Sequence, residues 1–301
     1  MMSAPERPRL NVVGCGRVGQ TLAKIFHALG ICQIQHLKSR DVRQAADAAN
    51  FIGAGVAVSR LDQMAAAELW LLSVPDASIS ETAQALSQVM VVPSDTAVQR
   101  PIAFHCSGFK TADALTALSL KHVSVASVHP VLSFASPATA TQQFRGTACG
   151  MEGDAFALEV LRQIFSAAGG LCFEIDAASK PLYHAAAVFC TNFTVVMQAL
   201  AREAWHDSGV PPELSSQIQS ALLRTTVENV LSMGPGRAIT GPAARGDLEV
   251  VKAQGDVVAQ WHPQAGEVYR ILSAMARSLA LRESTGKPFE NAQPDAGGNR
   301  R

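Results

Sequence analysis

The sequence has no excess of charge of either sign. Lys plus Arg number 25 and Asp plus Glu number 25, so the formal net charge at pH 7 is zero. Proteins that bind nucleic acids or anionic membrane surfaces usually carry a basic excess. We therefore expect neither kind of partner, and only a local basic pocket is compatible with this composition.

The sequence also lacks any C-x-x-C pair. Its six cysteines have no spacing typical of a metal site, and in a chain of 301 residues we expect them to be reduced thiols, as in cytosolic proteins. The opening M-M-S-A-P-E-R-P-R contains no apolar h-region, so it does not resemble a secretory signal. These absences predict a cytoplasmic protein without a metal centre.

One segment lacks charge over a length that could span a bilayer, from Pro181 to Ala201. It contains several polar side chains that would be costly in lipid unless paired: His184, Thr191, Asn192, Thr194 and Gln198. We interpret it as a helix buried by protein on most of its sides, and we expect no membrane partner.

The length suggests about two domains. Apolar residues make up 48% of the chain and charged residues 17%, which is typical of a globular protein. We place the boundary at residue 150, with a nucleotide-binding domain over 1–150 and a helical domain over 151–301. The polar stretch 284–301 is expected to be a disordered tail.

A glycine motif follows the first predicted strand, Arg9 to Val13. Gly14, Gly16 and Gly19 have the G-x-G-x-x-G spacing, and a helical pattern follows them. In a βαβ unit, the first glycine permits a tight turn, the second lets a pyrophosphate approach the backbone, and the third allows close packing of helix on strand. The free N–H groups at the start of the helix then face the anion, which predicts dinucleotide binding.

The end of the second predicted strand, Cys32 to Leu37, indicates which dinucleotide binds. NAD sites usually place an acidic residue about 20 positions after the glycines, at the ribose hydroxyls. Here the chain has Ser39 and Arg40 instead, and a guanidinium can pair with a 2′-phosphate through two hydrogen bonds. We therefore expect NADP rather than NAD. Asp41 can cap the next helix.

Further strands and helices alternate through the first half. Predicted strands run from Glu68 to Val74, from Pro101 to His105 and from Val123 to Val128. They are followed by Pro75-Asp76, by Cys106-Ser107-Gly108 and by His129-Pro130. Ligands of open α/β sheets lie beyond the carboxyl ends of the strands, so we expect these residues to face one crevice. The fold class is thus α/β, a Rossmann-type, doubly wound and mostly parallel sheet.

The second half has mainly helical patterns after two more short strands and a helix. A long helix is expected from Ala177 to Ser208, and further helices run over 211–233, 248–258 and 263–281, with a loop from Gly234 to Asp247. Lys180 and His184 are spaced i, i+4 and share a helix face. Either could act as a general acid near a nicotinamide, although an exposed lysine and a core histidine would give the same pattern. In the loop, Arg245 could hold a substrate carboxylate or form a salt bridge.

Five segments carry a resemblance to a known family: G-C-G-R-V-G, F-H-C-S-G (Phe104 to Gly108), S-V-H-P-V-L-S-F (Ser127 to Phe134), Y-H-A-A-A-V-F-C-T-N (Tyr183 to Asn192) and T-G-P-A-A-R-G-D (Thr240 to Asp247). From about Leu10 to Leu281 the chain resembles the bacterial Rossmann-like oxidoreductases with a C-terminal domain of unknown function. These are distant relatives of pyrroline-5-carboxylate reductase and the β-hydroxyacid dehydrogenases. The resemblance implies an NADP-binding domain and a helical dimerisation domain similar to the C-terminal domain of 6-phosphogluconate dehydrogenase.

Many β-hydroxyacid dehydrogenases carry a K-x-x-x-N motif with a catalytic lysine. This chain has Lys180 at the lysine position and His184 at the asparagine position, which argues against simple hydroxyacid chemistry. We expect an NADP-dependent oxidoreductase that transfers a hydride between the nicotinamide and a small polar keto, imino or hydroxy substrate bound between the domains.

The expected catalytic residues are His129, Lys180, His184 and Asn192, with Lys180 or His184 as proton donor and Ser133 nearby. The expected cofactor-binding residues are Gly14, Cys15, Gly16, Arg17, Val18, Gly19, Ser39, Arg40, Ser73, Val74, Pro75 and Ser107. A non-catalytic NADP-binding sensor or assembly module is the alternative, and a reductase that uses a deazaflavin is a third interpretation. Because a domain of roughly 150 residues can hardly cover a long uncharged helix, we also expect a homodimer formed through the C-terminal helices.

Overall fold

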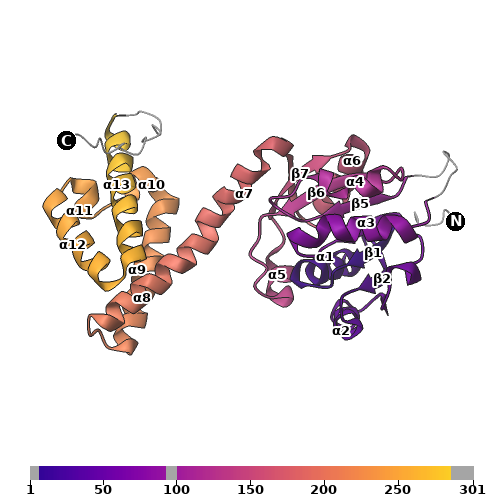
Figure 1. The fold of residues 1–301 in the computed structure, drawn as a ribbon, viewed down its shortest axis with the longest axis horizontal. Helices are drawn as coiled ribbons and strands as arrows, with labels where there is room; N and C mark the ends of the chain where they lie inside the picture. Colours follow the sequence, from indigo (N-terminus) through magenta and orange to yellow (C-terminus); the bar gives the residue numbers. More distant parts are fainter. Residues whose placement is uncertain (1–6, 93–99, 286–301) are drawn as a thin grey trace, which may run out of the picture. The chain divides into compact units, whose positions relative to one another are not determined.

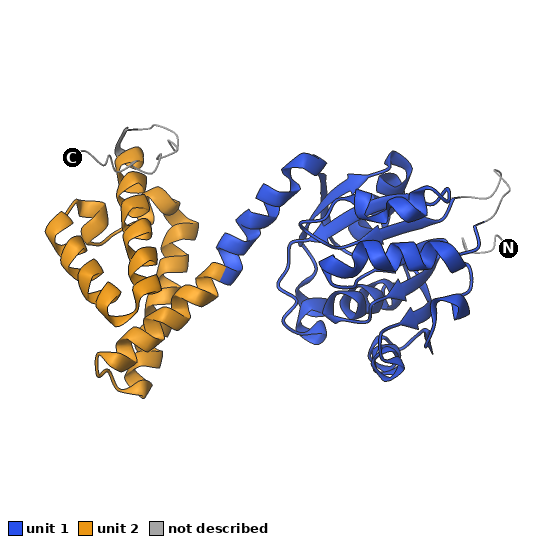
Figure 2. Ribbon diagram, in the orientation of Figure 1, with its two compact units in different colours: residues 1–192 blue, residues 193–301 orange. Residues whose placement is uncertain are grey.

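The computed structural model describes residues 7–92 and 100–285. The chain divides into two compact units, residues 1–192 and residues 193–301 (Figure 2). The first unit contains the sheet with its covering helices, and the second is helical (Figure 1). The expected tail falls almost entirely outside the described residues.

The eight strands of the first unit form one sheet, in the order β3-β2-β1-β4-β5-β6-β7-β8. All neighbours are parallel except β6 and β7, so the predicted fold class is confirmed. The strands are β1 Arg9–Val13, β2 Gln33–Lys38, β3 Val56–Val58, β4 Leu69–Leu72, β5 Ile102–His105, β6 Ser124–Pro130, β7 Ala148–Gly153 and β8 Leu171–Glu174.

Helices cover both faces of this sheet. Successive strand residues point to opposite faces, so Leu10 and Val12 pack in one apolar cluster while Val13 packs in the other. The first cluster includes side chains of α1, α2 and α6, and the second includes side chains of α3 and α4. The helices of this unit are α1 Arg17–Ala28, α2 Val42–Ile52, α3 Ile79–Val89, α4 Thr116–Ser119, α5 Pro137–Gln143, α6 Ala155–Ala167 and α7 Lys180–Val188.

The compact units divide later in the chain than the expected boundary at residue 150. That position lies inside β7, and β8 extends the same sheet to Glu174. Helix α6 also buries Leu161 and Phe165 in the core of the sheet. The strands after residue 150 therefore belong to the first unit, because their hydrogen bonds and apolar side chains are satisfied there.

The expected long helix after Ala177 is interrupted. A 3₁₀ turn at Ala177–Ser179 precedes α7, and a π-helical turn at Phe189–Phe193 separates α7 from α8. Pro181 lies in the first turn of α7, where its missing N–H costs no hydrogen bond. By length and composition, Ala177–Asp207 could cross a membrane, a test that core helices of soluble proteins also pass.

The second unit consists of helices with little interior. Among residues 193–283, the buried positions are Ser215, Ala265 and Gly266. The expected loop from Gly234 to Asp247 contains two short helices, each begun by a glycine at positive φ and a proline. The helices are α8 Thr194–Asp207, α9 Pro212–Met233, α10 Pro235–Ala238, α11 Pro242–Arg245, α12 Leu248–Trp261 and α13 Pro263–Thr285.

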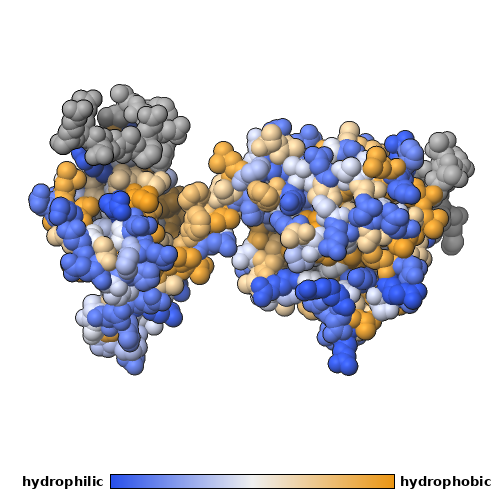
Figure 3. All heavy atoms as spheres, in the orientation of Figure 1, coloured by the Kyte–Doolittle hydropathy of each residue, from blue (hydrophilic) through white to orange (hydrophobic). Residues whose placement is uncertain are grey.

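The expectation that the uncharged helix is buried on most sides is wrong for the single chain. None of its apolar window is buried, and Leu182, Phe189 and Val195 are all more than half exposed. Apolar surface lies along α7 and α8 (Figure 3). The physical reason is that the rest of the chain covers less than half of each of these residues.

Candidate functional site

The glycine turn joins β1 to α1 and is built around backbone contacts. Gly14 has a φ of +100°, and a Cβ there would lie 2.6 Å from the carbonyl carbon and oxygen of Ser73. A Cβ at Gly19 would lie 2.4 Å from the carbonyl oxygen of Gly14. Neither position tolerates a side chain, because the turn packs directly on the end of β4.

Gly16 is the open position of the turn. A Cβ added there would meet no atom within 4 Å, and Gly16 is the residue that precedes α1. Helix α1 has no side-chain cap and no acidic residue in its first turn. Its first N–H groups therefore stay available to an anion, as a pyrophosphate site requires.

A cleft of about 440 Å³ extends from the glycine turn along the carboxyl ends of β1, β2 and β4. Sixteen residues line this cleft. Five of them belong to the loops and to α3: Leu61, Ser78, Glu81, Thr82 and Ala85. The others are Val13, Gly14, Cys15, Gly16, Lys38, Ser39, Arg40, Gln44, Ser73, Val74 and Pro75. The cleft thus gathers eight of the twelve residues expected to bind the cofactor.

The end of β2 supplies the positive charge of the cleft. Lys38 and the exposed Arg40 both line it, and the Ser39 hydroxyl donates a hydrogen bond to the Gln44 side chain. Asp41 accepts a hydrogen bond of 2.9 Å from the Arg43 N–H and caps α2, so its carboxylate is engaged. The residues present here suit a phosphate better than ribose hydroxyls.

Four of the residues expected to bind the cofactor lie outside the lining of the cleft. Arg17 is exposed in the first turn of α1, Val18 packs against the core and Gly19 is buried under the turn. Ser107 donates to Asp76 at 2.6 Å and accepts from the N–H groups of residues 109 and 110 at 3.1 and 2.8 Å. Its hydroxyl is therefore occupied in shaping the loop after β5.

Ser73 lines the cleft, but its hydroxyl and its N–H both form hydrogen bonds within the protein. Its hydroxyl donates a hydrogen bond to the Gly14 carbonyl, and its N–H donates to the Val13 carbonyl at 2.8 Å. These bonds tie the end of β4 to the glycine turn. Ser73 therefore braces the turn, while Val74 and Pro75 continue the wall of the cleft.

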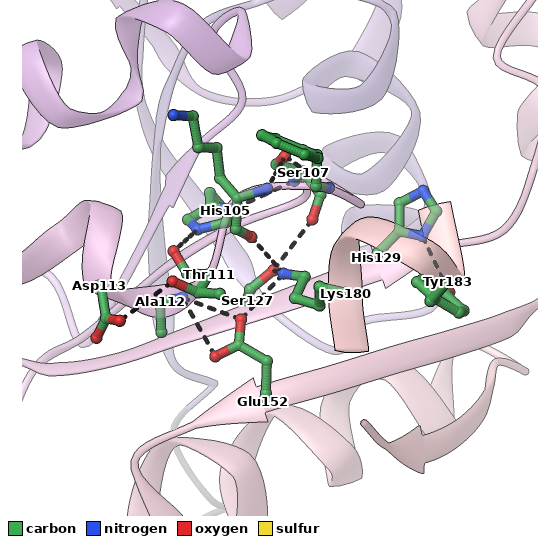
Figure 4. Close-up of polar contacts among 12 residues, drawn as sticks. His105, Ser107, Thr111, Ala112, Asp113, Ser127, His129, Glu152, Lys180 and Tyr183 are labelled. Atoms are coloured by element: carbon green, nitrogen blue, oxygen red, sulfur yellow. Dashed lines mark hydrogen bonds and ion pairs between the residues drawn. The ribbon is translucent and has the colours of Figure 1, made fainter. Parts of the chain in front are cut away.

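Lys180 is completely buried and does not face a cleft. Its ammonium donates hydrogen bonds to the carbonyl of Lys110, to the Ser127 hydroxyl at 2.5 Å and to the Glu152 carboxylate at 2.9 Å (Figure 4). Burial lowers the pKa of Lys180, and the bond to Glu152 opposes that shift. All three ammonium hydrogens are used, so neither a proton donor to substrate nor an exposed lysine fits this geometry.

The network around Lys180 fixes the loop that follows β5. Glu152 also accepts the Ala112 N–H at 2.9 Å, and Ser127 donates to the Ser107 carbonyl at 3.2 Å. The buried ion pair therefore connects the first turn of α7 with β7, β6 and this loop. Glu152 was not predicted, because a lone acidic residue in a strand carries no sequence signal for a partner 28 positions away.

Two imidazoles meet over Gly108. The rings of His129 and His184 are 5.7 Å apart in an edge-to-face arrangement. A Cβ at Gly108 would lie 2.4 Å from Cδ2 of His184 and 2.8 Å from Cε1 and Nε2 of His129. The glycine of the C-S-G segment thus makes room for both histidines, which the sequence analysis placed in the site separately.

Tyr183 joins this cluster and was not predicted as a site residue. Its hydroxyl lies 3.0 Å from Nδ1 of His129 (Figure 4). Burial, together with the nearby His184 and Lys180, lowers the pKa of His129 to about 4. Tyr183 stands beside His184 in the sequence, but a neighbouring position on a helix gives no signal for contact with a strand residue.

The remaining expected residues lie away from this cluster or in the other unit. Asn192 is exposed in the π-helical turn and accepts a hydrogen bond from Thr191 at 2.9 Å. Ser133 is exposed in the segment after β6. Arg245 lies in the second unit and pairs with Asp247 at 3.1 Å, as the salt-bridge interpretation predicts.

Comparisons with known proteins agree with this architecture. Residues 9–98 match the family described as NADP oxidoreductase, coenzyme F420-dependent, and residues 147–276 match a domain of unknown function, DUF2520. No curated protein matches the chain.

Three solved structures illustrate the likeness of the fold. A putative NADP oxidoreductase from Bacteroides fragilis has a TM-score of 0.72 and 23% identity, over 91% of this chain and 99% of that one. A protein from Thermotoga maritima has a TM-score of 0.67 and 25% identity, over the same shares of the two chains. Pyrroline carboxylate reductase from Plasmodium falciparum, solved with NADP bound, has a TM-score of 0.55 and 12% identity, over 92% of this chain and 100% of that one.

The resemblance stated from the sequence motifs is therefore confirmed. The chain combines an N-terminal domain of the F420-dependent NADP oxidoreductase family with a C-terminal domain of the DUF2520 family.

Proposed function

We propose that the protein is an NADP-dependent oxidoreductase that transfers a hydride between the nicotinamide and a small polar keto, imino or hydroxy compound. One observation carries the proposal: an open glycine cradle and a pair of imidazoles lie at the same carboxyl edge of one sheet. The hydrogen bond from Ser107 to Asp76 links the loop after β5, where Gly108 contacts both imidazoles, to the loop after β4, whose first residue, Ser73, contacts the glycine turn. Binding and reaction sites of open α/β sheets lie at this edge.

The proposed cofactor contacts follow from the shape and charge of the cleft. The space over Gly16 and the uncapped start of α1 accept the pyrophosphate, and Arg40 and Lys38 pair with the 2′-phosphate of NADP. The bound nicotinamide would supply the hydride. The B. fragilis protein, a putative NADP oxidoreductase, and the NADP-bound P. falciparum reductase support this proposal at the level of the fold.

We assign the proton donor to His184 rather than Lys180. The ammonium of Lys180 donates its three hydrogen bonds to groups inside the protein. The ring of the half-buried His184, in contrast, lies beside Gly108 and His129. An imidazole can act as a general acid toward a carbonyl or imine that receives a hydride.

A titration followed by a turnover assay tests the proposal. Calorimetry of the apoprotein should detect NADPH binding, and NADPH oxidation should then appear with some member of a panel of keto acids and cyclic imines. His184→Ala should lower kcat about 100-fold or more, while His206→Ala, on an exposed histidine of α8, should not. Absence of binding would overturn the proposal, and binding without any turnover would favour an NADP sensor.

We also propose a homodimer formed through the helical unit. Exposed apolar side chains lie on α8, α9, α12 and α13, including Val195, Leu231, Val257 and Ile271. Monomeric proteins rarely expose so many large apolar side chains, and a second copy offers surfaces of the same chemistry. The apolar length of Ala177–Asp207 is then explained by burial between protomers.

A further inference from the structure

The pairing of β6 with β7 places His129 directly opposite Gly150. A Cβ at Gly150 would lie 2.8 Å from the Tyr183 hydroxyl and 3.1 Å from Cζ of that ring. The phenol therefore occupies the space over Gly150, next to the imidazole on the neighbouring strand. Only a residue without a side chain at position 150 allows this approach.

Two further contacts hold the phenol in this place. The Tyr183 ring packs edge-to-face on Phe173 of β8, with centroids 6.1 Å apart, and on His129, with centroids 5.5 Å apart. One helical turn earlier, Lys180 anchors the same helix to Glu152 of β7. The hydroxyl is thus directed at Nδ1 of His129 by a rigid frame.

The direction of the hydrogen bond follows from the partners that each group has. Burial raises the pKa of Tyr183 to about 12, so the phenol keeps its proton at neutral pH, and among the described residues Nδ1 of His129 is the acceptor within hydrogen-bond distance of that proton. Burial lowers the pKa of His129 to about 4, so its ring is neutral. A neutral imidazole that accepts at Nδ1 carries its single proton on Nε2.

The Nε2 edge of His129 lies beside Gly108 and His184. Among residues 7–92 and 100–285, no group forms a hydrogen bond with Nε2 of His129. This nitrogen is also not among the buried polar atoms that lack a hydrogen-bond partner. The Nε2–H group is therefore available to a ligand. It can stabilise an oxygen or nitrogen on which negative charge develops.

We propose that Tyr183 is a positioning residue that fixes His129 in the neutral Nε2–H tautomer, which then donates a hydrogen bond to the reacting oxygen or nitrogen of the substrate. The hydrogen bond from His129 to the substrate rests on the proposed reductase function, whereas the tautomer of His129 does not depend on it. In the reaction, His129 polarises the substrate and keeps its proton, and His184 provides the proton that is transferred.

Nitrogen NMR of the full-length protein tests the tautomer directly. In protein labelled with ¹⁵N-histidine at about neutral pH, the His129 signals, assigned with a His129→Gln variant, should show a protonated Nε2 and an unprotonated Nδ1. Tyr183→Phe removes the donor and should move His129 to a mixture of tautomers. Tyr269→Phe is the matched control: the chain has two tyrosines, and the Tyr269 hydroxyl bonds to Gln254 in the other unit.

The inference is overturned if wild-type His129 carries its proton on Nδ1, or if Tyr183→Phe leaves the Nε2–H signal unchanged. Where Tyr183→Phe does not fold, Gly150→Ala is the second variant, because its Cβ displaces the hydroxyl while the phenol stays in the chain. It should cause the same loss of the Nε2–H state, and an unchanged tautomer in it also contradicts the inference.

Kinetics then test the role in the reaction. Tyr183→Phe should lower kcat about 10-fold or more with little change in KM or in NADPH affinity, and the loss should not add to that of His129→Gln. Full additivity, or a change confined to KM, would overturn the positioning role. If the wild-type protein reduces nothing, the proposed function fails while the NMR result still decides the tautomer.

Discussion

At the scale of single residues, the cations at the end of β2 underlie the proposed choice of cofactor. Lys38 and Arg40 line the cleft, whereas Asp41, the nearest acidic residue, is engaged as the cap of α2. The end of β2 thus offers a phosphate two positive charges and offers a ribose hydroxyl no free carboxylate, although Glu81 of α3 also lines the cleft. The proposed preference for NADP therefore depends on one short segment.

Arg40→Ala should weaken NADPH binding about 10-fold or more and leave NADH binding nearly unchanged, because only NADPH has the 2′-phosphate. Arg43→Ala is the control, since Arg43 is exposed on α2 and does not line the cleft. Calorimetric titration with both cofactors measures the effect. Equal losses for the two cofactors would show that Arg40 does not recognise the phosphate.

Lys180→Met should lower the free energy of unfolding by about 3–5 kcal/mol, because it leaves the buried Glu152 carboxylate without its partner. The double variant Lys180→Met, Glu152→Leu should recover much of that loss. Lys252→Met breaks an exposed pair with Asp256 and should have little effect on the free energy of unfolding. Urea unfolding distinguishes these cases, and equal losses at the two lysines would contradict the role of burial.

His105 should make the protein sensitive to acid. It is fully buried, accepts the Ser107 N–H at Nδ1 and bonds to the Thr111 carbonyl through Nε2, and burial lowers its pKa to about 4. The unfolded chain binds the proton more readily, so this stability is complete above about pH 6.5 and is lost as the pH falls toward 4. His129 contributes with the same sign.

The free energy of unfolding should thus fall by about 3 kcal/mol through His105 alone between about pH 6.5 and 4. Unfolding curves of His105→Asn should show a shallower pH dependence. His122→Asn, at an exposed position with positive φ that asparagine accepts, should retain the wild-type slope. A wild-type stability that rises on acidification over this range would refute the argument.

At the scale of elements, the turn between β1 and α1 separates packing from binding. Gly14 and Gly19 press against the end of β4, whereas Gly16 faces open space. Close packing of α1 on the sheet therefore needs the outer two glycines. The middle glycine leaves room for the proposed cofactor, since no atom of the described residues outside its chain neighbours lies within 4 Å of a Cβ added there.

Substituting these glycines should give opposite results. Gly19→Ala forces its Cβ against backbone and should lower the free energy of unfolding by about 1–3 kcal/mol or more. Gly16→Ala should leave stability unchanged within about 0.5 kcal/mol but weaken NADPH binding about 10-fold or more. Thermal unfolding and cofactor titration on both variants check this, and normal cofactor binding by Gly16→Ala would remove the proposed cradle.

At the scale of the whole molecule, the two units differ in how many of their residues they bury. The first unit has two apolar clusters on opposite faces of its sheet, while residues 193–283 bury three positions. So small an interior leaves much of the apolar surface of this unit uncovered. The proposed association with a second copy would supply the missing contacts.

Leu231→Glu should convert the proposed dimer to monomers, because Leu231 is 81% exposed on the apolar surface of α9. Leu120→Glu is the control: Leu120 is 78% exposed as well, but it lies in the first unit beside α4. Sedimentation at micromolar concentration gives the masses. A monomeric wild-type protein, or an equal effect of both substitutions, would exclude dimerisation through the helical unit.

Much of the fold follows from local patterns. The strand at Arg9–Val13, the glycine turn and helix α9 lie within a few residues of their predicted positions. The interruption between α7 and α8 was not predicted, because the apolar pattern continues through the π-helical turn. The placement of β7 and β8 in the sheet also depends on hydrogen bonds between distant segments.

The sequence alone determined the nucleotide-binding topology, the glycine cradle and the charge beside it, because these depend on spacings within one βαβ unit. It also indicated His129 and His184 as site residues. Only the tertiary structure decided that Lys180 is buried against Glu152 and that Tyr183 meets His129 over Gly150. The physical reason is that a buried charge and a tautomer depend on partners that folding brings from other strands.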